Sequence, residues 1–327
     1  MQNVQLSDSF AGKRPSFIVN TLVLIGIMGL YLVTGALILI VTGIGSSGEQ
    51  VSGLTPALVS RHLASIRLAQ AFGQILVLAI PVILLSAIHT GSGNPFSRKS
   101  LAFLGVGRIP DGKVLLLGVS GIFLLQPLLQ TISSFEQLFL WPALGKAGME
   151  VLRQQEQMDA FIRELARVRS VPEFFLVIFV LALTPAICEE LLFRGYIQQN
   201  FTRSMSSGNA VLLTGVVFAF FHMSAFNILS LALLGWFIGY IYAKTGNLAV
   251  PAFVHFVNNL AALLVFFFTE GTGPDSVSHP EKVIYSVWWW LFLAGSLYFF
   301  MKLLRRLSSE NVTKGLALDD DRVDPEK

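Results

Sequence analysis

Long apolar runs recur along nearly the whole chain, and they constrain its fold more than any other feature. A membrane-spanning helix needs about 20 mostly apolar residues. Eight candidate runs cover residues 17–44, 66–88, 114–136, 174–196, 210–223, 226–243, 248–268 and 283–301, of which the fifth is short. In lipid each backbone polar group must be satisfied internally, so such runs form helices. The sequence therefore predicts an all-α, polytopic transmembrane helix bundle of about eight spans.

The composition favours a membrane-embedded protein over a soluble or nucleic-acid-binding one. Of the 327 residues, 54% are hydrophobic and only 13% are charged, with a net charge of +3. Soluble domains have about 25% charged residues. The Lys and Arg residues form short clusters between the apolar runs, which indicates membrane lipid and no nucleic acid among the partners. Cys188 is the only cysteine, which excludes an intramolecular disulfide and a cysteine-based zinc site.

The runs divide the chain into five segments. We expect spans one to three in residues 1–140, an interfacial amphipathic helix in 141–171, a helical core with the polar motifs in 172–268, a C-terminal span in 283–306 and a disordered acidic tail in 307–327. The segment 141–171 mixes charges with apolar residues at helical spacing, which is typical of a helix lying on the bilayer surface. Whether this helix also covers the site as a lid stays open.

Basic residues near the ends of the runs predict the orientation. Lys and Arg are retained on the cytoplasmic side of a membrane. With an even number of spans, Lys13 and Arg14 before the first run and Lys302, Arg305 and Arg306 after the last all face the cytoplasm. The first run is too long for a signal-peptide core. We therefore expect a multi-pass protein of the cell membrane with both termini in the cytoplasm.

The first polar motif contains Glu189, Glu190 and Arg194, directly after the apolar residues 174–187. Ionisable residues inside a span are costly and usually face the bundle interior in a functional role. At about 100° per residue, Glu190 and Arg194 share one helix face and can form an i,i+4 salt bridge, whereas Glu189 points about 100° away from Glu190. This geometry gives Glu190 and Arg194 a structural role and leaves Glu189 free for chemistry. Pro185 removes one helical hydrogen bond and favours a local bend.

Two further polar motifs lie on later runs. Phe218 and His222 end the short fifth run, and His255 and Asn259 lie four residues apart in the seventh. Residues at i and i+4 share a helix face, so both side chains can enter one cavity. Polar side chains in hydrocarbon need a hydrogen-bonding partner, and an interhelical hydrogen-bond clamp is the alternative to a catalytic site.

Taken in order, these motifs resemble those of a known family. Glu189-Glu190-x-x-x-Arg194, Phe218-x-x-x-His222 and His255-x-x-x-Asn259 resemble the motif set of the CPBP family, which comprises type II CAAX prenyl endopeptidases and bacteriocin-processing or immunity proteins. The stretch Leu234–Tyr240 and the turn Thr245–Leu248 also look like the family's glycine-containing helix and T-G-S-L turn, with Asn247 where serine is usual. The resemblance covers roughly residues 172–265.

The resemblance implies an intramembrane endopeptidase that hydrolyses a membrane-anchored protein or peptide. In that mechanism Glu189 and His222 hold and deprotonate the water, and His255 and Asn259 stabilise the oxyanion. Phe218 would support the site structurally. A carboxylate in a partly desolvated site and an Asn donor suit these tasks.

Three alternatives stay open at this stage. Glu189, His222 and His255 could together bind zinc, the one possible cofactor, with an open position for water. The chain could be a non-catalytic membrane immunity or scaffold protein, since the family includes such members. A proton-coupled transporter is the third alternative, although no second half repeats the broken-helix pattern.

Overall fold

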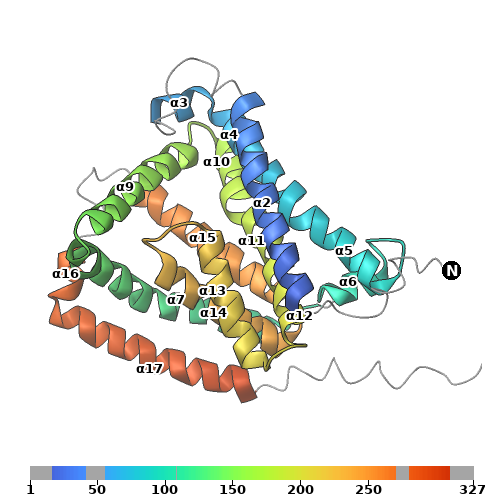
Figure 1. Ribbon diagram of the computed structural model, residues 1–327. Helices are drawn as coiled ribbons and strands as arrows, with labels where there is room; N and C mark the ends of the chain where they lie inside the picture. The colour runs from blue at the N-terminus through green and yellow to red at the C-terminus, as the bar shows by residue number, and fades with distance from the viewer. Residues whose placement is uncertain (1–16, 42–55, 108, 270–279, 310–327) are drawn as a thin grey trace, which may run out of the picture.

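The computed structural model describes residues 17–41, 56–107, 109–269 and 280–309. All regular elements in these ranges are helices, and none is a strand (Figure 1). The acidic tail, apart from its first residues, and the basic pair before the first run lie outside the described residues. Their predicted roles stay predictions.

Within the described residues, six helices are long and apolar enough to cross a membrane. They are Leu63–Thr90, Gly112–Ala143, Val171–Phe201, Ile228–Thr245, Ala249–Phe268 and Val287–Ser309. The first and fifth predicted spans correspond to the shorter apolar helices Phe17–Tyr31 and Ser207–Phe221. The all-α polytopic bundle is therefore confirmed, and the number of eight spans stays a prediction.

Several of these spans are divided into shorter helical segments. In chain order the α-helices are α2 (Phe17–Val41), α3 (Pro56–Arg61), α4 (Leu63–Gln74), α5 (Ile80–Thr90), α6 (Arg98–Phe103), α7 (Gly112–Phe135), α8 (Trp141–Ala143), α9 (Lys146–Ala166), α10 (Val171–Ile178), α11 (Thr184–Glu190), α12 (Gln199–Phe201), α13 (Ser207–Phe221), α14 (Ile228–Thr245), α15 (Ala249–Thr269), α16 (Pro280–Ile284) and α17 (Val287–Ser309). Four π-helical segments join neighbouring α-helices, namely η1 (Ile75–Ala79), η2 (Glu136–Leu140), η3 (Phe179–Leu183) and η4 (Leu191–Gln198).

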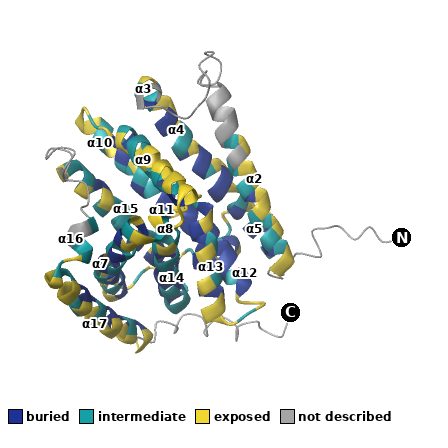
Figure 2. Cartoon of the chain, turned by 60° about the vertical axis from the view of Figure 1, so that its left-hand side comes forward, coloured by how far each residue is buried: buried dark blue, intermediate teal, exposed yellow. Residues whose placement is uncertain are grey.

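Residues Val171–Phe201 form one continuous rod through the bundle, called the central rod below. It consists of α10, η3, α11, η4 and α12, and it contacts α4 and η1 as well as α13 and α15. Every residue from 188 to 198 is buried. Figure 2 shows this part of the chain in dark blue, whereas α17 at the edge shows exposed positions. Neighbouring helices thus shield the stretch that carries the charged motif.

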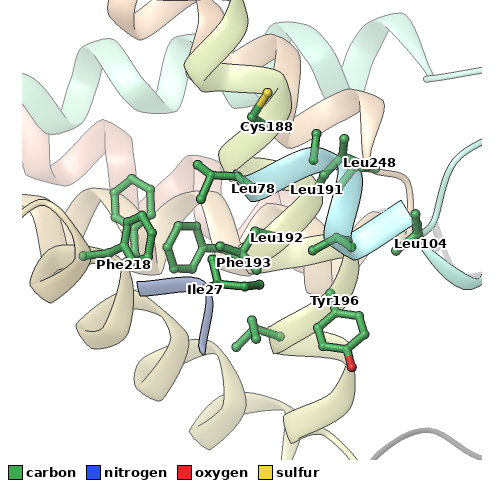
Figure 3. Packing of buried hydrophobic residues seen from close by; sticks show 14 of the residues in the cluster. Ile27, Leu78, Leu104, Cys188, Leu191, Leu192, Phe193, Tyr196, Phe218 and Leu248 are labelled. Atoms are coloured by element: carbon green, nitrogen blue, oxygen red, sulfur yellow. The ribbon is translucent and has the colours of Figure 1, made fainter. Parts of the chain in front are cut away.

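Among the described residues, two apolar clusters are the largest. One surrounds the central rod and joins it to α2, α5 and α13; Figure 3 shows Ile27 of α2 beside Phe193 and Phe218. The other joins α7, α14, α15 and α17 through residues such as Ile122 and Phe237. The amide of Asn20 also donates to the Ile197 carbonyl at 3.1 Å, which fixes α2 against the rod.

The segment predicted as an amphipathic helix forms α8 and α9, separated by a turn at Gly145. The buried Arg67 of α4 donates through Nε to the Leu165 carbonyl at 3.0 Å and through a terminal nitrogen to the Arg167 carbonyl. At its other side, α9 accepts a bond from Asn227 to Gln155 at 3.4 Å. Most of the segment is helical, and an interfacial helix on a bilayer surface stays a prediction.

Candidate active site

The central rod departs from regular α-helix on both sides of Glu189. The π-helical η3 ends at Leu183, directly before Thr184 and Pro185, and η4 begins directly after Glu190. Proline cannot donate the backbone bond that a helix interior requires, and π-bulges often occur at functional sites. Pro185 therefore lies at a break in the regular helix, as its position one turn before Glu189 suggested.

Glu190 and Arg194 form the predicted salt bridge in the bundle interior. The Arg194 Nη1 atom lies 2.8 Å from Glu190 Oε1, and both side chains are 0% exposed. Arg194 Nη2 donates to the Gly235 carbonyl at 2.8 Å, and the guanidinium lies over the Phe218 ring at 4.8 Å. Removing one partner of a buried pair leaves an uncompensated charge. This network therefore supports the structural role expected for the pair.

Glycines in α14 allow this network to form across the helix interface. A Cβ on Gly235 would lie 3.0 Å from the Phe218 ring, and one on Gly239 would lie 2.7 Å from Gln198 Oε1. Small residues let membrane helices approach closely. Gln198, one turn after Arg194, donates to the Gly239 carbonyl at 2.8 Å. Two polar side chains of the rod thus bind two successive turns of α14.

His255 bonds to Glu190, which the sequence did not indicate. Its Nδ1 lies 2.8 Å from Glu190 Oε1, the same oxygen that contacts Arg194. Since the carboxylate oxygen of Glu190 accepts from Arg194, it also acts as the acceptor here, and Nδ1–H of His255 is the donor. The ring is therefore oriented by Glu190, and its Nε2 is the atom left for other partners. Glu190 thus supports His255 as well as Arg194.

Glu189 faces His222, on the other side of the rod. The Glu189 Oε2 atom has no hydrogen-bond partner among the described residues and lies 3.7 Å from His222 Nε2. His222 Nδ1 lies 2.8 Å from the Phe218 carbonyl, so Nδ1–H is the donor to this oxygen and Nε2 carries the lone pair when the ring is neutral. Two lone-pair acceptors therefore face each other, and they repel unless a proton, a water or a cation joins them.

The end of α13 fixes the direction of His222. His222 directly follows the last residue of the helix, and Met223 has a φ of 50°. This left-handed conformation costs a non-glycine residue on the order of 1–3 kcal/mol and is often retained at functional sites. The tight turn ends the helix at the residue that faces Glu189.

Phe218 occupies the centre of the site. Its ring centroid lies 4.5 Å from that of His222 and 5.9 Å from that of His255. The ring is 0% exposed, and its other neighbours are Arg194 and Phe193. Phe218 therefore holds the two histidines and the arginine at fixed distances, which agrees with its expected supporting role.

Asn259 lies one helical turn beyond His255 on α15 and is half-buried. Its Oδ1 accepts a bond from Asn258 at 3.4 Å, and Asn258 Oδ1 accepts one from Gln126 of α7 at 2.9 Å. This chain of amides leaves the Asn259 NH₂ group as the available donor. Its role as an oxyanion donor stays a prediction.

With this geometry defined, we compared the chain with known proteins. A family model described as "Rce1-like: Type II CAAX prenyl endopeptidase Rce1-like" matches residues 171–261. That range begins with the central rod and ends two residues after Asn259, so it contains all three polar motifs. This segment belongs to the Rce1-like family. Searches of curated proteins and of solved structures gave no match.

The family assignment agrees with the helical bundle. Rce1-like proteins are membrane proteases, and the six span-length helices fit a multi-pass membrane protein. The Rce1-like segment supplies every residue of the expected site, while α2 to α7 precede it without a matching motif.

The T-G-N-L turn also has a clear local function: Gly246 has a φ of 57° at the end of α14, and Asn247 Oδ1 accepts from the Ala249 N–H at 3.0 Å.

The proposed zinc ligands do not form a three-residue cluster in the described part of the chain. No group of three His, Cys, Asp or Glu side chains there is arranged to hold a metal ion. Glu189 and His222 present facing lone pairs that suit a metal, but His255 is turned toward Glu190 by its Nδ1. The bond to Glu190 uses only Nδ1 of His255 and leaves its Nε2 available, so zinc binding by the three residues stays a prediction.

Gln198 is a site-supporting residue that sequence reasoning missed. It is 1% exposed and lies four residues after Arg194, on the side of the rod that contacts α14. The signal was an amide within an otherwise apolar span, because such groups need a partner in the bundle. The Rce1-like segment thus uses two polar residues, not one, to bind the glycine-containing helix.

Proposed function

We propose that this protein is an intramembrane endopeptidase that hydrolyses a membrane-associated polypeptide through a water held by Glu189 and His222. The observation that carries this proposal is the 3.7 Å separation between His222 Nε2 and Glu189 Oε2, which has no hydrogen-bond partner among the described residues. A water beside the pair can donate one proton to each atom. A buried carboxylate and a neutral imidazole are both competent general bases.

The proposed reaction can be followed through its proton transfers. As the water oxygen attacks the peptide carbonyl, Glu189 accepts one water proton and the carbonyl oxygen becomes an oxyanion. When the C–N bond breaks, the oxyanion reverts to a carbonyl and the proton passes to the leaving amine. A carboxylic acid and an amine are the products, and Glu189 returns to its ionised form.

His255 and Asn259 would stabilise the oxyanion. His255 donates through Nδ1 to Glu190, so its Nε2 can donate only if the ring is an imidazolium. Glu190 Oε1 lies 2.8 Å from Nδ1 and would be the acceptor for this ring. The Asn259 NH₂ group supplies a second, neutral donor. Removing one such donor typically lowers the rate by about 10²–10³.

The substrate class follows from the membrane location and the family. Type II CAAX prenyl endopeptidase is the description of the matching family, so a prenylated C-terminal peptide is the first probe to test. We propose a cell-membrane protein with both termini in the cytoplasm. Reporter fusions at each end test this orientation, and termini on opposite sides would require an odd number of spans.

The decisive experiment measures cleavage by the purified protein in lipid nanodiscs. Farnesylated CAAX peptides and their unprenylated counterparts are compared, with product masses as the readout. We expect Glu189→Ala and His222→Ala to reduce turnover to background, and Asn259→Ala to retain faint activity. Residues that act as a unit are strongly non-additive, so double variants should lose little more. Full activity in Glu189→Ala would overturn the proposal.

A zinc-dependent form of the same hydrolysis is the second candidate. It is favoured by the two facing lone pairs of Glu189 and His222, which suit a cation as well as a water. Chelator treatment separates the two, because a metal site loses activity on chelation and regains it with added zinc. Cleavage that persists in chelator supports the metal-free reaction. No cleavage of any membrane-tethered peptide would favour a scaffold or immunity role.

A further inference from the structure

The helix α7 precedes the Rce1-like segment, yet it packs against the helix that carries His255 and Asn259. It contacts both α14 and α15. A Cβ on Gly118 would lie 2.6 Å from Cγ2 of Val254, the residue directly before His255. Small residues let membrane helices approach closely. The position of α15, and with it that of Asn259, is therefore set in part by a helix that has no family motif.

Gln126 of α7 is a polar residue within a span-length helix. Its side chain is exposed, whereas Leu125 and Pro127 on either side of it are buried. The Gln126 Nε2 atom donates to Asn258 Oδ1 of α15 at 2.9 Å. An amide within a span needs a hydrogen-bonding partner, and a residue of a neighbouring helix can supply one. The two helices are thus joined by an amide–amide bond one residue before Asn259.

The bond from Gln126 continues to Asn259. Asn258 Nδ2 donates to Asn259 Oδ1 at 3.4 Å, so each amide in this series donates to the oxygen of the next. A primary amide accepts at its oxygen and donates at its nitrogen. Because Asn258 occupies the Asn259 oxygen, the NH₂ group is the end that Asn259 offers to another partner. A donor at the Gln126 end thereby sets a donor at the Asn259 end.

This direction matters because the two ends of the Asn259 amide act oppositely on an oxyanion. The NH₂ group stabilises a developing negative charge, whereas the amide oxygen repels it. The last torsion of an Asn side chain has a broad, roughly two-fold profile, so rotation can exchange the two ends. A donor whose direction is fixed beforehand needs no reorganisation during the reaction.

We propose that Gln126 is a positioning residue for Asn259, acting through Asn258 to keep the Asn259 NH₂ group directed at the oxyanion. The proposal rests on the peptidase function proposed above. It gives a role in the reaction to a residue of α7, outside the Rce1-like segment. Gln126 acts through a second residue, and Asn259 is the one that contacts the reacting atoms.

The first test reverses the direction of the amide series. A carboxylate only accepts hydrogen bonds, so in Gln126→Glu the Asn258 NH₂ group would turn toward α7 and its oxygen toward Asn259. Asn259 would then donate to Asn258 and present its own oxygen to the oxyanion. We expect kcat for the farnesylated peptide to fall about 10²–10³-fold, as on loss of an oxyanion donor, with KM changed less. Gln126→Leu removes the bond without reversing the series and should lower kcat only about three- to tenfold.

The pH dependence of Gln126→Glu is a readout that a purely structural bond would not change. A protonated carboxyl still donates, whereas the carboxylate does not. The ratio of variant to wild-type kcat should therefore fall as the pH rises. A variant that equals the wild type across the whole pH range overturns the proposal.

Two controls separate this effect from that of an added charge. Gln130→Glu places the same carboxylate one turn later on α7, where the native amide donates to Ser134 Oγ at 3.5 Å, and should leave kcat unchanged. In an Asn259→Ala background, a charge acting directly on the oxyanion would still lower kcat, whereas an effect through Asn259 would be absent. We therefore expect Gln126→Glu to cause no further loss in that background. A further loss there, or an equal loss in Gln130→Glu, overturns the proposal.

Thermal melting of the same variants excludes unfolding and tests the bond without using activity. Gln126→Leu and Asn258→Leu remove the two partners of one bond, so the double variant should lose less stability than the two single variants together. Additive losses would show that the bond contributes nothing and would overturn the proposal. Coupled stabilities with wild-type kcat in Gln126→Glu would reject the positioning role and keep the peptidase. A wild type that cleaves no membrane-tethered peptide would reject the peptidase function and, with it, the role of the amide series in the reaction.

Discussion

The central rod and α17 both have the length and apolarity of a membrane span, yet their surroundings differ. In the rod, Glu190 and Arg194 are 0% exposed and two π-helical segments interrupt the regular helix. α17 is one uninterrupted α-helix from Val287 to Ser309, with large exposed side chains such as Trp288 at 81%. Local apolarity thus identifies a span, whereas the placement of charges shows which span lies inside the bundle.

The basic residues of the two helices sharpen this comparison. Arg194 lies within the rod and is bonded to a carboxylate and to a main-chain carbonyl. Lys302, Arg305 and Arg306 lie near the end of α17 and are exposed. Basic side chains near a span end reach water, whereas one in the interior needs a partner of opposite charge. Substitutions in the two helices should therefore have very different effects.

The largest expected effect is that of Arg194→Ala. It leaves Glu190 as an uncompensated buried charge, which typically costs about 3–5 kcal/mol. Glu190→Ala should cost a similar amount, while Glu189→Ala should cost less because Glu189 has no salt-bridge partner of this kind. The measurement is thermal melting in detergent together with folded yield.

Arg305→Ala on α17 is the matched control and should melt with the wild type, since exposed substitutions usually change stability little. If Glu189→Ala melted lower than Arg194→Ala, the division of roles between the two acidic residues would be wrong.

A smaller effect on stability is expected when glycines are substituted in the bundle interior and on α17. A Cβ on Gly215 would lie 2.9 Å from the Trp236 backbone nitrogen, so Gly215→Ala should separate α13 from α14 and cost about 1–3 kcal/mol. On α17, nothing lies within 4 Å of a Cβ on Gly295. Gly295→Ala should raise stability by up to about 1 kcal/mol, because alanine favours helix. Equal melting temperatures for the two variants would contradict the difference in packing.

The smallest effect concerns α9, which lies outside the six span-length helices. Burial raises the pKa of Asp159 above its usual value, although Arg163 and the bond from Gln155 oppose the shift. The ionised form is therefore penalised in the folded state, and this penalty appears as the pH rises from the unfolded-state pKa through the folded-state pKa. Asp159→Asn should stabilise the protein by at most about 0.5 kcal/mol at neutral pH.

The same substitution should have no effect below the unfolded-state pKa of Asp159, where the carboxyl is protonated in both states. Melting curves of the wild type and Asp159→Asn across this pH range check the sign. A benefit that grew as the pH fell would show that the carboxylate stabilises α9 instead.

Features that depend on local sequence were predicted well. The helical spans, the Glu190–Arg194 pair, the opposite direction of Glu189 and the helix in 141–171 all follow from periodicities along one chain segment. We expected a bend in the helix at Pro185. The structure shows that a π-helical segment ends shortly before this residue. The two π-helical segments of the rod have no sequence signal that hydrophobic periodicity could detect.

Contacts between helices were harder to foresee. The family resemblance implied that His255 stabilises the oxyanion, and helix geometry paired Glu190 with Arg194, but neither gave a reason to join His255 to Glu190. The two residues are 65 positions apart, and either could satisfy its polarity with several partners.

The sequence by itself determined that this chain forms apolar helices and that three of them carry polar residues, because hydrophobic length and helical period are properties of contiguous residues. Only the tertiary structure decided the partners of those residues. It paired Glu189 with His222, joined His255 to Glu190, and packed Tyr31 of α2 against Phe221. The physical reason is that lipid forces every span to form a helix, whereas glycine contacts, π-helical segments and buried hydrogen bonds fix how the helices rotate against one another.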